Sequence, residues 1–87
     1  MVDEHENTVF VGGKDIGNYV GAVLTQLEEF DEVFVRARGQ ANIGKAVVVS
    51  EMMRDKYGKE TSIDTRTDIK PDTGDCVTAV EIVVTDQ

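Results

Sequence analysis

The sequence predicts an α+β fold: a two-layer β-α-β-α-β-β sandwich in which two helices cover one face of a four-stranded mixed sheet. Three observations lead to this prediction. Two segments repeat apolar residues at helical spacing, four are short and rich in β-branched residues, and Gly, Pro or Asp clusters separate them. With 87 residues the chain has room for one domain, which we place at residues 8–87 after a disordered acidic tail at 1–7.

The first strand and the first helix are predicted near the amino terminus. Thr8 to Gly12 alternates valine with other residues and ends at a glycine pair, which is typical of a short strand followed by a turn. A helix follows Asp15, a candidate N-cap. Its apolar positions recur at three- and four-residue spacing: Ile16, Tyr19, Val20, Val23, Leu24, Leu27 and Phe30.

The second strand is predicted from Glu32 to Arg38, where β-branched and aromatic residues alternate with others. Successive side chains of a strand point to opposite faces. One face therefore takes Val33, Val35 and Ala37. The other takes Phe34, Arg36 and Arg38, so the two arginines are expected side by side.

The second helix is predicted to begin near Asn42, with Asn42 or a neighbour as its N-cap, and to run to about Lys56, with Gly58 ending it. Its wide apolar surface predicts contact with its own sheet and with a second surface, most simply a dimer partner. The chain then alternates over 59–69, turns at 70–75 and ends in a β-rich strand from Cys76 to Thr85, so the last two strands form a hairpin. Cys76 is expected to be a buried core thiol.

Topology predicts where the charges meet. Right-handed crossovers make the first two strands parallel, with both helices on one face of the sheet and the other face open. The carboxyl ends of these strands share one edge, where α/β sheets commonly bind ligands. Lys14, Arg38 and Lys45 converge there, and the acidic stretch 28–32 falls at the opposite end.

The charge along the chain is segregated in the same way. The net charge is −8, yet residues 33–50 contain three positive charges and no carboxylate. An acid-free segment in an acidic protein indicates an anionic partner, because even a few carboxylates would cancel the local potential. We expect nucleic acid there, contacted by Arg36 and Arg38, because arginine binds phosphate bidentately.

Two motifs resemble the Alba family of archaeal chromatin proteins. Residues 14–20, Lys-Asp-Ile-Gly-Asn-Tyr-Val, resemble the family's segment at the start of the first helix. Residues 35–47 resemble its signature strand, its Ala-Arg-Gly turn and its Lys-Ala-Val helix start. The resemblance continues through 51–57 and the closing strand at 80–84, and so spans nearly the whole domain.

The resemblance implies the fold of the C-terminal domain of bacterial translation initiation factor three. It also implies a homodimer, with higher assembly on DNA, that binds duplex DNA or RNA largely through the backbone. On this resemblance we expect nucleic-acid contacts at Lys14, Arg36, Arg38, Gln40, Asn42, Lys45 and Lys70. We expect dimer or dimer-to-dimer contacts at Val49, Met53 and Tyr57, with packing of the helix as the simplest alternative for Met53 and Tyr57.

The chain departs from the family pattern in ways that predict weaker binding. Gly13 stands where the family often has the first of two lysines, and Gln40 replaces a common arginine. The interval from Gln40 to Lys45 is one residue longer than the usual loop, and the hairpin places Asp68, Asp72 and Asp75 around Lys70.

Two alternatives stay open on the sequence. One is an RNA-preferring protein that stacks bases on Phe10 and Phe34 of the open sheet face. The other is an acidic protein-interaction module that has lost strong DNA binding and works through Tyr57 and the second helix. Competition between matched RNA and DNA separates the first from duplex DNA binding.

Residues for catalysis are not in place. Gly12-Gly13-Lys14 lacks the spacing of a phosphate-binding loop. The only histidine that could activate Cys76 is His5, in the tail. We therefore expect no enzyme, cofactor, metal site or small-molecule substrate. A single cysteine, no signal peptide and no apolar run of roughly 20 residues predict a cytoplasmic, nucleoid-associated protein without membrane contact.

Overall fold

The computed structural model describes residues 7–69 and 72–86, except for the side chains of Arg66, Asp68 and Ile69. Its elements follow the predicted order: β1 (Thr8–Phe10), α1 (Ile16–Leu27), β2 (Glu32–Arg38), α2 (Gln40–Tyr57), β3 (Glu60–Ile69) and β4 (Cys76–Thr85). The strands form one sheet in the order β1-β2-β4-β3. β1 and β2 are parallel and the other pairs are antiparallel, so the predicted α+β fold with a four-stranded mixed sheet is confirmed.

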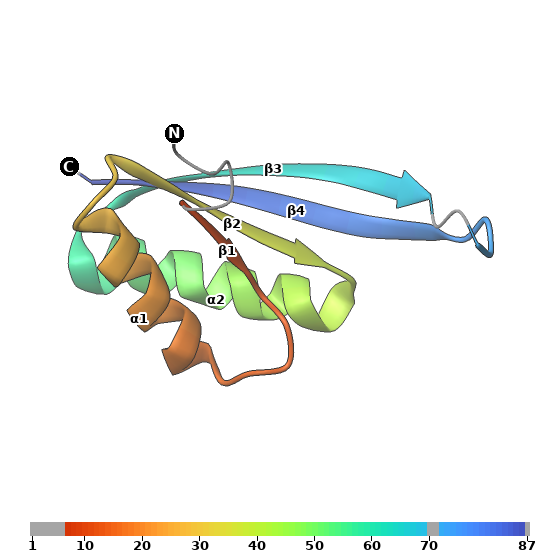
Figure 1. Ribbon diagram of the computed structural model, residues 1–87, viewed down its shortest axis with the longest axis horizontal. Helices are drawn as coiled ribbons and strands as arrows, with labels where there is room; N and C mark the ends of the chain where they lie inside the picture. Colours follow the sequence, from red (N-terminus) through yellow and green to blue (C-terminus); the bar gives the residue numbers. More distant parts are fainter. Residues whose placement is uncertain (1–6, 70–71, 87) are drawn as a thin grey trace.

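Both helices lie on one side of the sheet, which leaves the opposite face open (Figure 1). The strand residues that face the helices form the core. On β2 these are Val33, Val35 and Ala37, each at most 5% exposed, as the alternation predicts. The intervening residues, Phe34, Arg36 and Arg38, belong to the open face.

Gly39 lets the chain pass directly from β2 into α2. Its φ of 86° lies in the left-handed region that favours glycine. The Gly39 carbonyl accepts a hydrogen bond from the Ile43 N–H at 2.9 Å. Gly39 is therefore the N-cap and α2 begins at Gln40. Asn42 lies inside the helix and does not cap it, and residues 40–45 form helix rather than a loop.

The other element ends differ modestly from prediction. β1 ends at Phe10, before the glycine pair, and α1 ends at Leu27. Phe30 lies beyond α1, in a turn where its N–H and that of Glu29 both donate to the Gln26 carbonyl. Gly58 ends α2 in the left-handed conformation, with φ of 67°, as predicted.

Val49 and Met53 of α2 are core residues. Both side chains are 0% exposed in the single chain, where they pack with the strand residues that face the helices. A side chain without exposed surface leaves nothing for a second subunit to contact. The expectation that these two residues make a dimer contact is therefore wrong, whereas Tyr57 is 42% exposed.

Cys76 is exposed, which corrects the prediction of a buried thiol. It is the first residue of β4, at the far end of the β3–β4 hairpin. Figure 1 shows this hairpin extending past the helices. Because no helix covers the sheet there, the apolar neighbours of Cys76 in sequence do not make it part of the core.

The first described residue is attached to the sheet. The Asn7 carbonyl accepts a hydrogen bond from the Phe34 N–H at 2.8 Å, and the Asn7 amide donates to the Glu32 carbonyl at 3.4 Å. Asn7 therefore belongs to the domain and not to the tail that we predicted at 1–7. The rest of that tail, 1–6, lies outside the described residues.

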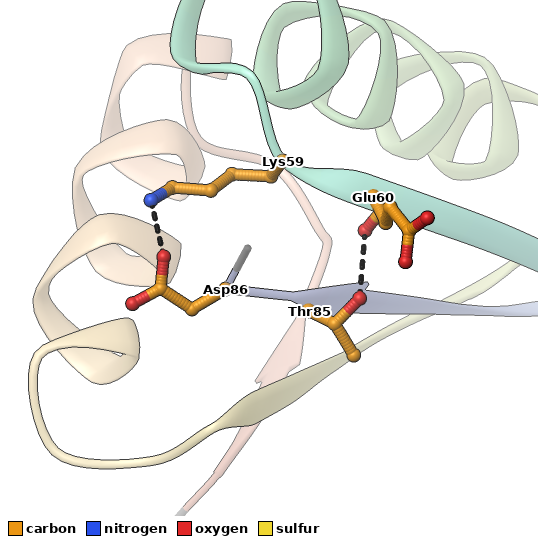
Figure 2. Close-up of polar contacts among 4 residues, drawn as sticks. All are labelled: Lys59, Glu60, Thr85 and Asp86. Atoms are coloured by element: carbon orange, nitrogen blue, oxygen red, sulfur yellow. Dashed lines mark hydrogen bonds and ion pairs between the residues drawn. The ribbon is translucent and has the colours of Figure 1, made fainter.

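Polar contacts join the β3 start and the β4 end (Figure 2). Lys59 Nζ donates to Asp86 Oδ1 at 2.5 Å, and Thr85 Oγ1 donates to the Glu60 carbonyl at 3.4 Å. The Asp86 N–H donates to the Asp31 carbonyl, which ties the same segment to the start of β2. These contacts hold the end of the sheet that lies opposite the hairpin tip.

Candidate nucleic-acid interface

The carboxyl ends of β1 and β2 and the start of α2 meet at one end of the molecule (Figure 1). Lys14 is exposed in the β1–α1 connection, and Arg38 is exposed as the last residue of β2. Lys45 lies in the second turn of α2. We call Lys14, Arg38 and Lys45 the basic end. The hairpin projects past this same end.

Lys45 contacts the β1–α1 loop. Its Nζ donates to the Gly12 carbonyl at 3.0 Å and to the Lys14 carbonyl at 3.1 Å. An ammonium group has three donors, so two of them are used within the protein. Lys45 therefore holds the Lys14 loop against α2. The family resemblance implied only a nucleic-acid contact for this lysine.

Tyr19 of α1 contacts the same loop through the opposite groups. Its hydroxyl oxygen accepts from the Gly12 N–H at 2.8 Å and from the Lys14 N–H at 2.9 Å. Lys45 and Tyr19 together hold both the carbonyl and the N–H groups of Gly12 and Lys14. We call these contacts the loop clamp. In the sequence, Tyr19 is recognisable only as an apolar position of the helix. The role of its hydroxyl depends on the β1–α1 loop folding back over α1, which the sequence does not indicate.

Lys45→Met is expected to lower the free energy of unfolding by about 1 to 2 kcal/mol, because two carbonyls lose a charged donor. Lys45→Arg should retain part of this stability. Chemical denaturation measures it, with Lys56→Met as the control, since Lys56 is an exposed lysine in the last turn of the same helix. Equal stability of the Lys45→Met and Lys56→Met proteins would contradict a clamp.

The polar residues at the start of α2 lie beside Arg38. Gln40 is exposed as the first residue of the helix. Asn42 donates from Nδ2 to the Arg38 carbonyl at 3.1 Å, so its amide helps to hold the end of β2. The structure thus brings Lys14, Arg38, Gln40, Asn42 and Lys45 to one end.

Arg36 lies one row further along the open face and has an internal partner. Its Nε donates to Glu81 Oε2 of β4 at 2.7 Å, with the two side chains 41% and 36% exposed. A phosphate would have to compete with this carboxylate for the guanidinium. Sequence reasoning missed Glu81, because its place opposite Arg36 follows from the register of strands 45 residues apart.

The acidic residues that follow α1 and begin β2 lie at the opposite end. Glu28, Glu29, Asp31 and Glu32 are all exposed there, as the topology predicts. In the hairpin turn, Asp72 and Asp75 are exposed. Lys70, the predicted contact in that turn, lies outside the described residues.

Within residues 7–69 and 72–86, no helix is long and apolar enough to cross a membrane. Within the same residues, no three His, Cys, Asp or Glu side chains are grouped so as to hold a metal ion.

Known proteins match this chain in sequence. The Alba family model matches residues 7–68. The chain is 42% identical over 86 residues to the DNA/RNA-binding protein Alba of Methanoculleus marisnigri, with 92% of this chain and 93% of that protein covered. It is 51% identical over 53 residues to the DNA/RNA-binding protein Alba 1 of Archaeoglobus fulgidus, where the match spans 60% of this chain and only 58% of the relative.

Solved structures match it as well. Alba from Thermoplasma volcanium superposes with a TM-score of 0.72 at 35% identity, covering 92% of this chain and 100% of that one. An Alba protein of Trypanosoma brucei superposes with a TM-score of 0.81 at 31% identity, covering 97% of this chain and 72% of that one. By sequence and by fold, the chain belongs to the Alba family.

Proposed function

We propose that this chain is a non-enzymatic, chromatin-type protein that binds the backbone of duplex DNA as a homodimer. Its relatives are named DNA/RNA-binding proteins. The observation that carries the proposal is the basic end, where exposed cations gather in a chain of net charge −8. Binding through the phosphate backbone requires positive charge and orientation, and no chemistry.

The residues at and around the basic end have different roles in binding. Lys14 and Arg38 contact phosphates directly, and Gln40 adds a polar contact beside them. Lys70 stays a predicted contact of the hairpin. Lys45 and Asn42 act mainly by holding the Lys14 loop and the end of β2 in place. Arg36 has to exchange its contact with Glu81 before it can bind a phosphate.

The dimer forms through the side of the molecule where α2 lies beside β3. Ile63 of β3 pairs with the buried Ile82, so it points to the helix side of the sheet, yet it is 52% exposed. Tyr57 at the end of α2 is 42% exposed. A second subunit that covers these side chains buries apolar surface and brings a second basic end to the same duplex.

Salt dependence tests the proposal. If a dimer neutralises roughly six to eight phosphates, log K against log salt for B-DNA should have a slope of about −5 to −7. Titration of one duplex across a series of salt concentrations measures it, and sedimentation of the free protein measures the dimer. A slope near zero would contradict backbone binding, and a monomer at binding concentrations would contradict the homodimer.

A further inference from the structure

The open face of the sheet has a row of four side chains that come from all four strands. Phe10 on β1 pairs with Arg36 on β2, Arg36 pairs with Glu81 on β4, and Glu81 pairs with Asp64 on β3. Paired residues on neighbouring strands are adjacent on the same face. The row therefore runs aromatic, cationic, acidic and acidic across the sheet. Phe10, at its edge, is 58% exposed.

Beside this row the open face is hollowed. A hollow of about 470 Å³ is lined by residues that include Phe10, Arg36, Arg38, Ala79 and Glu81. The small side chain of Ala79 accounts for the hollow. Ala79 pairs with the much longer Arg38 in the next row of the open face, and it is 7% exposed. The volume falls within the range of pockets that hold small organic ligands.

The hollow does not suit a phosphate. Among its lining residues, Arg36 and Arg38 are positive while Asp64 and Glu81 are negative, so their formal charges cancel. A phosphate seated there would lie near two carboxylates and would compete with Glu81 for Arg36, which is bonded to it at 2.7 Å.

The same lining suits a planar, uncharged ring with donors and acceptors on its edge. Phe10 offers an aromatic surface, Ala79 offers a small apolar floor, and the Arg36 and Glu81 side chains offer donors and acceptors. Nucleobases have this combination of a stacking face and a polar edge. Bases inside a duplex are stacked on their neighbours, so only an unpaired base can lie on a sheet.

We propose that the open-face hollow binds an unpaired nucleobase of single-stranded nucleic acid, which stacks on Phe10 with its edge toward Arg36 and Glu81. This inference rests on the proposed nucleic-acid binding and adds a second contact to it. The basic end holds the phosphate backbone, and the hollow takes a base from a strand that is not paired. Arg38 belongs to the basic end and also lines the hollow, so the two contacts adjoin on the protein.

A fluorescent reporter tests this directly. The chain has no tryptophan, so Phe10→Trp places one emitter in the hollow. Short RNA and DNA single strands should quench its emission, whereas an abasic strand of equal length and duplex DNA should not. Val48→Trp is the control, because Val48 is 38% exposed on α2, in the helix layer. Stronger quenching by RNA than by DNA would indicate that the protein also contacts the 2′-hydroxyl, and equal quenching would indicate that it contacts only the base.

Affinity gives a second readout on variants that keep every charge. Phe10→Ala removes the stacking surface, and Ala79→Leu fills the hollow from its floor. Each should weaken single-strand binding about 5- to 150-fold, the usual range for one stacked base. Duplex binding should be unchanged. Thermal unfolding of both variants, compared with that of the unsubstituted chain, shows whether the fold is retained.

The outcomes separate this inference from the proposed function. Equal quenching by the abasic strand, or no quenching while duplex binding persists, would overturn the base site and leave the backbone contacts standing. Quenching by single strands in a protein that does not bind duplex would overturn the proposed duplex binding and support the base site.

Discussion

Arg38→Glu is expected to weaken binding of duplex DNA by about a hundredfold, since each subunit of the dimer loses one charge-assisted contact worth about tenfold. Arg38 is exposed at the end of β2, where the parallel strands end and α2 begins. Backbone contacts do not read sequence, so two unrelated duplexes should lose the same factor. Fluorescence anisotropy at a fixed, low salt concentration measures both.

Arg54→Glu is the matched control for this charge reversal. Arg54 is exposed in the last turn of α2, away from the basic end, and contacts Asp55 at 3.2 Å. The two variants have the same net charge, so any difference between them reports position. Equal affinities of the two proteins would show that the nucleic acid lies on another surface.

Met53→Ala is expected to lower the free energy of unfolding by about 2 to 5 kcal/mol, the range for truncating a large buried side chain. Met53 is fully enclosed between α2 and the sheet, so its loss leaves a cavity in each subunit. Urea denaturation followed by circular dichroism measures the change. The loss should persist at every protein concentration.

Tyr57→Ala is the comparison, because Tyr57 is exposed at the end of the same helix. We expect it to shift dimer dissociation while leaving the core intact, so that its effect on stability diminishes as the protein concentration rises. If the Met53→Ala loss also disappeared at high concentration, Met53 would be a dimer contact after all.

Local patterns in the sequence predicted the elements well. Strict alternation in β2 assigned its residues to the correct faces, since that period depends only on the geometry of one strand. The ends of elements were less predictable. The start of α2 was misplaced because Gly39, read as the end of a strand, also serves as the N-cap of the helix.

The burial of apolar residues was predictable only for the parts of the strands that the two helices cover. Cys76 begins an apolar strand, yet the hairpin extends past the helices and leaves it exposed. The expected dimer contact at Val49 and Met53 fails because α2 is apolar on several sides, and the sequence does not say which side meets the sheet.

The sequence by itself determined the family, the order of the elements and the gathering of cations at one end, because strand period, helix period and short motifs are local properties of the chain. Only the tertiary structure decided what each cation does. Lys45 meets the loop that carries Lys14, and Arg36 meets Glu81, through packing between segments 31 to 45 residues apart. Such partners depend on strand register and helix placement. The sequence therefore identifies a basic residue, and the fold decides whether its charge can contact a ligand.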